Sequence, residues 1–70
     1  MEKYKKEINT INNFLNETQP NKKIQLANEI KNSGIFGLEK YHKIMLQEPI
    51  CLSGRIYYYN ENKNKYILAN

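Results

Sequence analysis

The chain has 70 residues, a formal net charge of +4 and one cysteine. A chain of this length forms one small domain and buries only about 60% of its unfolded surface. One cysteine excludes an intramolecular disulfide framework, and with one histidine it cannot supply the four ligands of a structural zinc site, so we expect neither metal nor cofactor. No apolar run approaches the ~20 residues of a membrane span, and the N-terminus lacks the apolar centre of a signal peptide, so a cytoplasmic location is expected.

The composition is dominated by four residue types. Asn, Lys, Ile and Tyr contribute 11, 10, 9 and 6 residues, and all four use codons with A or T in the first two positions. This bias indicates an AT-rich genome, such as that of a low-GC bacterium or its phage. The lysine excess is therefore partly codon usage, although a basic chain still favours acidic partners.

The first predicted element is an amphipathic helix over residues 2–17. Apolar side chains recur at intervals of three and four residues, which places them on one face of a helix. These positions are Tyr4, Ile8, Ile11, Phe14 and Leu15.

A second helix is predicted over residues 21–33, after a break at Pro20. Its expected buried positions are Ile24, Leu26 or Ala27, and Ile30. Gly34 is a candidate left-handed stop, with Ile35 expected to contact the last turn. Residues 1–34 would then form a helical hairpin.

Residues 38–47 fit two patterns. Leu38, Tyr41 and Met45 have helical spacing, whereas Ile44 and Leu46 alternate as in a strand. We favour a short helix that leads into extended chain before Pro49, because the residue preceding proline avoids the helical conformation.

The C-terminal part, from residue 50, is predicted to be β structure because its apolar residues alternate. A polar turn at residues 60–64 would separate two strands. The alternation assigns Ile50, Leu52, Gly54, Ile56 and Tyr58 to the core face, and Cys51, Ser53, Arg55, Tyr57 and Tyr59 to the opposite face. The predicted fold is a single α+β domain over residues 1–70, in which an N-terminal helical hairpin (1–34) packs on a small C-terminal antiparallel sheet within residues 35–70.

Residues 22–69 resemble the winged-helix DNA-binding domains. The segment Leu26-Ala27-Asn28-Glu29-Ile30 is similar to the first helix of their recognition motif. The resemblance implies that residues 38–47 form the reading helix and that the tyrosine-rich hairpin is the wing. The predicted reading helix would expose Lys40, His42, Lys43 and Gln47, without an arginine to bind guanine.

The strongest candidate contact surface lies in the segment RIYYYNENKNKYIL. Arginine and tyrosine are enriched in binding hot spots, and the same residues stack on unpaired bases while lysines bind phosphates. The alternative is that the rings pack within the protein. The predicted partner-binding residues are Arg55, Tyr57, Tyr59, Lys63 and Lys65.

A secondary basic face is predicted on the two N-terminal helices. It would contact phosphates or an acidic protein, or would simply be a solvated face of a lysine-rich chain. Its residues are Lys3, Lys5, Lys6, Lys22 and Lys23.

The sequence offers little for catalysis. His42 and Cys51 are the candidates for nucleophilic chemistry, and the chain has no Asp to orient such a pair. We therefore expect a protein that is not an enzyme. A small ribonuclease toxin that uses Tyr, His, Lys and Arg is the third hypothesis.

The favoured hypothesis is a small non-catalytic inhibitor from a phage or mobile element. It would bind and block a host protein that handles nucleic acid or takes part in defence, with a profile of size and composition like that of anti-CRISPR proteins. The alternative is a winged-helix-like transcriptional regulator that binds DNA. A homodimer through an exposed edge strand is left open.

Overall fold

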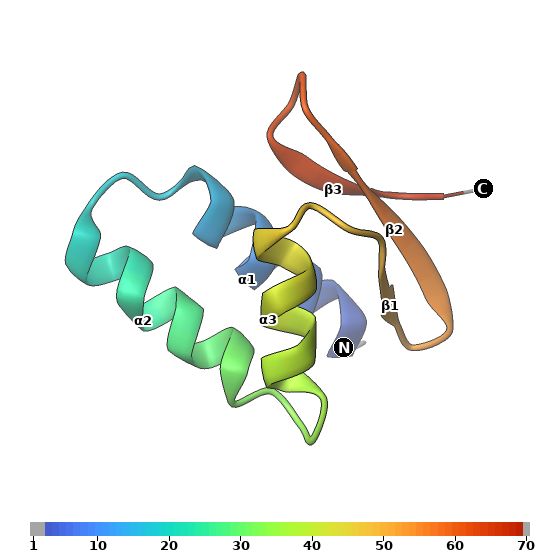
Figure 1. Ribbon diagram of the computed structural model, residues 1–70, viewed down its shortest axis with the longest axis horizontal. Helices are drawn as coiled ribbons and strands as arrows, with labels where there is room; N and C mark the ends of the chain where they lie inside the picture. The colour runs from blue at the N-terminus through green and yellow to red at the C-terminus, as the bar shows by residue number, and fades with distance from the viewer. Residues whose placement is uncertain (1–2, 70) are drawn as a thin grey trace.

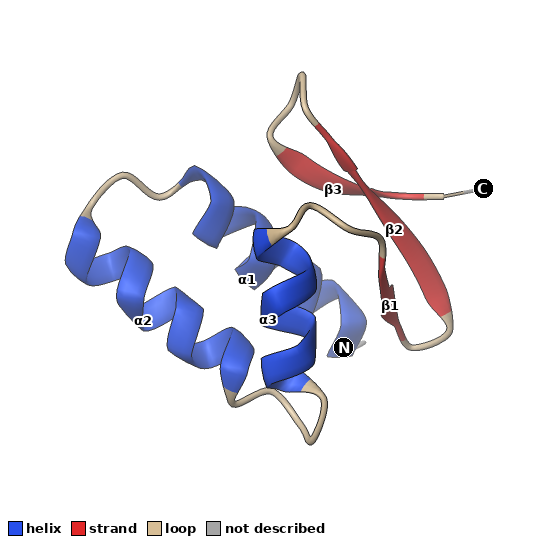
Figure 2. Cartoon of the chain, viewed as in Figure 1, coloured by secondary structure: helices blue, strands red, loops and turns tan. Residues whose placement is uncertain are grey.

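The computed structural model describes residues 3–69. Within these residues three helices precede a three-stranded antiparallel sheet with the order β1-β2-β3 (Figures 1 and 2). The elements are α1 (Lys3–Asn16), α2 (Pro20–Lys31), α3 (Gly37–Met45), β1 (Ile50–Leu52), β2 (Arg55–Asn60) and β3 (Lys65–Leu68). The predicted α+β class, with N-terminal helices packed on a C-terminal antiparallel sheet, is confirmed. The segment with two patterns forms the helix α3.

Helix α1 buries the predicted face. Ile11 and Phe14 are almost inaccessible, and Tyr4, Ile8 and Leu15 pack partly buried around the same core. The helical interval of the apolar residues was therefore sufficient to orient this helix.

Helix α2 begins with Pro20, which suits a first helical turn because that position needs no N–H donor. Ala27 and Ile30 are buried as predicted, but the burial predicted for Ile24 is wrong, since its side chain is 59% exposed. At about 100° per residue, Ile24 is rotated by about 60° from Ala27 and by about 120° from Ile30. It therefore projects beyond the edge of the buried face.

The connection between α2 and α3 is a tight turn. Gly34 has φ +75°, so the predicted left-handed stop is confirmed. The backbone N–H of Gly37 donates to the carbonyl oxygen of Gly34 at 3.3 Å, which leaves Ile35 and Phe36 at the corner of the turn. The predicted contact of Ile35 with α2 is wrong, because its side chain is 91% exposed.

Gly37 allows α3 to begin directly against the last turn of α2. A Cβ atom added at this position would lie 2.7 Å from the carbonyl oxygen of Ile30 and closer still to that of Lys31. Because both are backbone atoms of a helix, neither can move aside cheaply, so glycine sets the spacing of the two helices.

The predicted facing of β2 is wrong, because a tight turn separates it from β1. Ser53 and Gly54 both have positive φ (52° and 77°), as in the two-residue turns that join antiparallel strands. The alternation that was traced from Ile50 therefore does not continue across the turn. In the observed register Tyr57 lies opposite Ile50 and is 5% exposed, whereas Tyr58 lies on the outer face and is 53% exposed.

One cluster of buried side chains joins the helices to the inner face of the sheet. The rings of Tyr59 and Tyr66 meet edge to face with centroids 5.7 Å apart. Both hydroxyls are satisfied, since Tyr59 donates to Asn64 Oδ1 (2.6 Å) and Tyr66 donates to the carbonyl oxygen of Glu48 (2.7 Å). The core consists of Ile11, Phe14, Ala27, Ile30, Ile44, Ile50, Leu52, Tyr57 and Tyr66.

Hydrogen bonds of asparagine side chains join α1 to β3 and to the turn that precedes it. Asn12 Oδ1 accepts the backbone N–H of Tyr66 at 2.8 Å, and Asn12 Nδ2 donates to the carbonyl oxygen of Tyr66 at 3.4 Å. Asn64 Nδ2 donates to the carbonyl oxygen of Leu15 at 2.9 Å. The amide of Asn12 thus takes the place of a neighbouring strand at this point of the sheet edge, where an unpaired strand would invite association.

We expect Asn12→Ala to lower the free energy of unfolding by about 1–3 kcal/mol, because it leaves two backbone groups of Tyr66 without their partner. Urea denaturation followed by circular dichroism measures the change. Asn13→Ala is the matched control, since the Asn13 side chain is exposed and makes no hydrogen bond within residues 3–69. Equal effects of the two substitutions would contradict this role of Asn12.

Burial, together with the charges of Tyr59 and Glu48, raises the pKa of Tyr66 from 10.0 to about 12. The folded state therefore retains the phenolic proton more strongly than the unfolded chain does. The stabilisation of the fold by the protonated Tyr66 side chain is therefore complete below pH 10 and is lost as the pH rises towards 12. Between pH 10 and pH 12 we expect the denaturant concentration at the midpoint of unfolding to fall in the wild type and to fall less in Tyr66→Phe. An equal dependence of the two midpoints on pH would contradict the raised pKa of Tyr66.

Candidate functional site

The predicted contact set around Arg55 does not form one exposed face. The guanidinium of Arg55 stacks on the ring of Tyr4 in α1, 4.1 Å from its centroid. Tyr57 is buried and Tyr59 is half-buried, so both rings pack inside the sheet. The predicted exposure of Tyr57 and Tyr59 is therefore wrong, because the Ser53-Gly54 turn reverses the facing of β2. Arg55, at the start of β2, is exposed.

The lysines predicted to accompany this set lie elsewhere. Lys63 is exposed in the β2–β3 turn, and Lys65 is exposed on the outer face of the sheet, opposite Asn60. Their role in partner binding stays a prediction.

Only some of the lysines of the predicted secondary basic face are exposed. Lys5, Lys6 and Lys22 are exposed, whereas the side chain of Lys3 lies outside the described residues. Lys23 is half-buried, because its Nζ donates to the carbonyl oxygen of Phe14 at 3.0 Å and lies 4.6 Å from the centroid of the Phe14 ring. Lys23 thus bridges α1 and α2.

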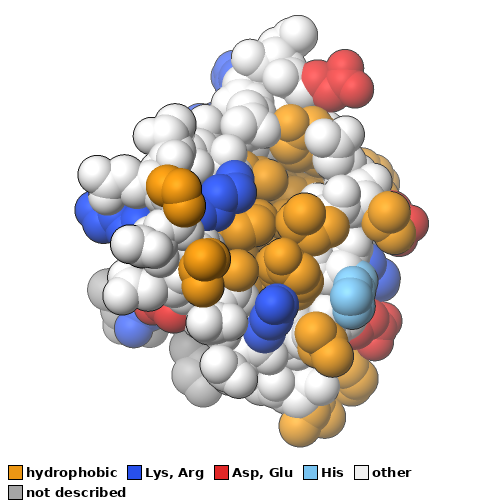
Figure 3. Space-filling view, turned by 60° about the vertical axis from the view of Figure 1, so that its left-hand side comes forward, with side chains coloured by type: hydrophobic (Ala, Val, Ile, Leu, Met, Phe, Trp, Pro, Cys, Tyr) orange, Lys and Arg blue, Asp and Glu red, His pale blue; other side chains and the backbone are white. Residues whose placement is uncertain are grey.

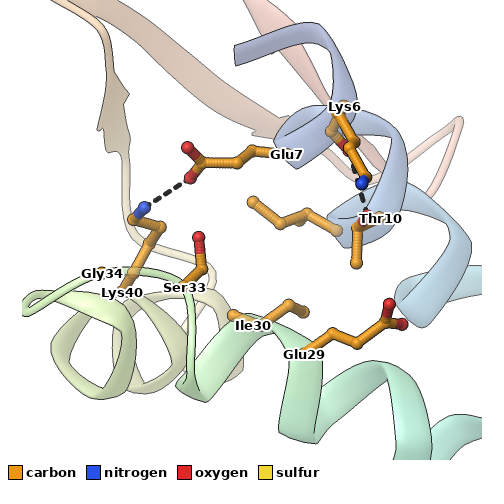
Figure 4. A pocket seen from close by; sticks show the side chains of 9 residues that line it. Lys6, Glu7, Thr10, Glu29, Ile30, Ser33, Gly34 and Lys40 are labelled. Atoms are coloured by element: carbon orange, nitrogen blue, oxygen red, sulfur yellow. Dashed lines mark hydrogen bonds and ion pairs between the residues drawn. The ribbon is translucent and has the colours of Figure 1, made fainter. Parts of the chain in front are cut away.

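An open groove of about 420 Å³ lies between α1 and the C-terminal half of α2 (Figure 4). Glu7 reaches across it to Lys40 of α3, with an ion pair of 2.7 Å between Oε2 and Nζ. Glu29, Thr10 and Ser33 also line the groove. Since the Lys40 side chain is 15% exposed and paired, the prediction that this helix exposes Lys40 is wrong.

Within residues 3–69, five of the nine large apolar side chains that are exposed lie at the two ends of α3. Leu38 and Met45, both 55% exposed, lie seven residues apart and therefore on the same side of the helix. Tyr41, which shares their helical spacing, is partly buried, whereas the residues that α3 buries are Gly37 and Ile44. We call the exposed set the α3 ridge: Ile35, Phe36, Leu38, Met45 and Leu46.

Lysine ammonium groups lie over the faces of two aromatic rings beside the α3 ridge. Lys31 Nζ lies 4.5 Å from the centroid of the Tyr41 ring, and the Tyr41 ring contacts that of Phe14 at 5.9 Å. Lys23 covers Phe14 in the same way. Figure 3 shows the resulting surface, in which hydrophobic side chains cluster and basic side chains lie among them.

The outer face of the sheet is a second, smaller apolar surface. Ile56 (48% exposed) and Tyr58 (53% exposed) project from β2, and Cys51 is exposed beside them on β1. The wrong facing of β2 thus exchanged the two sets of side chains. Tyr57, which was predicted to bind a partner, is buried, and Tyr58, which was predicted to be buried, is exposed.

The sequence contains one signal for the α3 ridge. Ile44, Met45 and Leu46 are consecutive apolar residues at the end of a short helix, and one buried face cannot accommodate all three. Such a run places apolar side chains in solvent.

Comparisons of the chain with protein-family models, curated proteins and solved structures give no match. Within residues 3–69 no helix has the length and apolar character to cross a membrane. In the same residues no three His, Cys, Asp or Glu side chains are grouped as a metal site. The side chains of His42 and Cys51 are exposed and make no hydrogen bond in this part of the chain.

Proposed function

We propose that this chain is a small non-catalytic binding protein that docks on a partner protein through the α3 ridge. The observation that supports this proposal is the exposure of large apolar side chains at both ends of one short helix. Soluble proteins rarely leave contiguous apolar surface uncovered, and such surface is typical of interaction sites.

The energies are sufficient for a binding site. Full burial of a Leu, Ile, Met or Phe side chain contributes about 1.5–3 kcal/mol. A partner that covers Leu38, Met45 and Phe36 would therefore gain the binding energy of a hot spot, and these side chains would form its centre within a polar surround.

We further propose that the protein acts as an inhibitor, made by a phage or mobile element, of a host protein that handles nucleic acid or takes part in defence. Its size and AT-rich residue usage support this origin. A non-catalytic protein of this size acts by occupying a surface that its target needs, and the net charge of +4 directs it towards acidic surfaces.

The surface of α3 does not favour the DNA-binding alternative. A reading helix presents side chains that bond base edges, mainly Arg, Lys, Asn and Gln. The exposed side of α3 presents Leu38, His42 and Met45, and Lys43 beside it is already paired with Glu39 at 3.8 Å.

The test is capture of the partner by two double variants. Leu38→Ser with Met45→Ser removes apolar surface from the α3 ridge, and Ile56→Ser with Tyr58→Ser removes it from the outer face of the sheet. We expect the ridge variant to lose at least about tenfold in partner affinity and the sheet variant to retain it. Circular dichroism confirms that both are folded.

The reverse order of the two variants would contradict the proposal. Binding to duplex DNA that weakens steeply with rising salt would also contradict it, and would support the regulator.

A further inference from the structure

We propose that the segment seated on the α3 ridge is an acidic amphipathic helix of the partner protein, lying along the junction of α2 and α3. This inference rests on the proposed function and specifies the chemistry of the partner. Two features carry it: the lysines held over aromatic rings, and the spacing of the exposed apolar side chains.

The lysines present positive charge at fixed positions. The ammonium groups of Lys23 and Lys31 lie over ring faces, and neither forms an ion pair with a carboxylate within residues 3–69. A partner carboxylate can bind Lys31 while the Tyr41 ring stays beneath it. Stacking limits the freedom of both side chains, so less entropy is lost when the ion pair forms.

The other charged pair on α3 does not offset these lysines. Glu39 is held 3.8 Å from Lys43. Both residues are two positions from Tyr41, about 200° around the helix, so this pair lies on the opposite flank of α3 from Lys31. Lys23 and Lys31 are thus two positive charges that no carboxylate within residues 3–69 pairs with. This imbalance favours an acidic partner by charge complementarity.

The apolar side chains match the period of a helix. Leu38 and Met45 are two helical turns apart, or about 10 Å along the axis. A partner helix with apolar residues at positions i, i+3 or i+4, and i+7 spans the same length and reaches both. Its flanking carboxylates would then lie over α2, where Lys31 and Lys23 are found.

A second copy of this chain is a poorer occupant. An isologous contact would bring Lys23 and Lys31 of both copies together, and neither lysine is paired with a carboxylate within residues 3–69. Duplex nucleic acid is poorer too, because phosphates would pair with the lysines but would leave Leu38 and Met45 against polar groups.

The experiment uses isotope-labelled full-length protein and two synthetic peptides of about 18 residues, long enough to form helix. Both carry leucines at the spacing given above. One has glutamates on the flanking positions and the other has glutamines there. Amide chemical shifts report where each peptide binds and with what affinity.

We expect the glutamate peptide to shift the amides of α3 and α2, and to bind at least about tenfold more tightly than the glutamine peptide. The difference should shrink in about 0.5 M salt. Lys31→Gln should remove most of it, whereas the control Lys65→Gln, on the outer face of the sheet, should not change it.

Equal affinities, shifts confined to the sheet, or no binding of either peptide would overturn the inference. Concentration-dependent shifts at α3 without peptide would assign the surface to a second copy, and shifts there with a duplex oligonucleotide would assign it to nucleic acid. The two proposals fail separately: if partner capture needs Leu38 and Met45 but the glutamate peptide has no advantage, the proposed function stands and this inference falls.

Discussion

Tyr57→Ala is expected to lower the free energy of unfolding by about 3–5 kcal/mol, whereas Tyr58→Ala should change it by less than about 1 kcal/mol. Tyr57 is 5% exposed and lies opposite Ile50 in the core, while its neighbour is 53% exposed on the outer face. The adjacent tyrosines form a matched pair, since the substitution is the same and only the face differs. Denaturation in urea measures both.

Domains have about 0.05–0.15 kcal/mol of stability per residue, which is about 3.5–10 kcal/mol for this chain of 70 residues. At the lower end of that range the Tyr57→Ala variant would be largely unfolded. Tyr57→Phe keeps the experiment informative, because it preserves the ring and should cost less than about 1.5 kcal/mol. A larger loss at Tyr58 than at Tyr57 would show that β2 faces the other way, since a shift of one residue exchanges the faces of a strand.

Gly37→Ala is expected to lower the free energy of unfolding by about 1–3 kcal/mol and to displace α3 from α2. The added methyl group would meet the backbone carbonyls of Ile30 and Lys31 and not a flexible side chain. Because α3 carries the ridge, its displacement should also weaken partner binding.

The control is Gly34→Asn, at the other end of the same turn. Gly34 has φ +75° and nothing within 4 Å of an added Cβ, and Asn tolerates the left-handed conformation, so this variant should lose less than about 1 kcal/mol. If Gly37→Ala were as stable as Gly34→Asn, the close contact of α2 and α3 would not be a constraint on the fold.

Local patterns predicted the elements that depend on local physics. The first helix followed from apolar intervals of three and four residues, and Gly34 followed from the need for a left-handed residue at a helix end. The predicted facing of β2 was wrong because it assumed that Ser53-Gly54 is part of a continuous strand. A Ser-Gly pair is a turn signal, and one turn was enough to exchange the faces.

The contacts that hold the tertiary structure could not be predicted from spacing. The Asn12–Tyr66 bonds join residues 54 positions apart, and the Lys40–Glu7 pair joins residues 33 positions apart. The α3 ridge was missed for a different reason. A helical period identifies an apolar face, but it does not distinguish a face that packs in the core from one that awaits a partner.

Site-specific photo-crosslinking tests the central claim, that the α3 ridge is the partner-binding surface. A photoreactive amino acid is placed at Met45 in one variant and at Tyr58 in another, and each is expressed in the cells that produce the protein. We predict that Met45 crosslinks to a partner protein and that Tyr58, on the outer face of the sheet, does not. A crosslink from Tyr58 with none from Met45, or a crosslink from Met45 to nucleic acid, would contradict the claim.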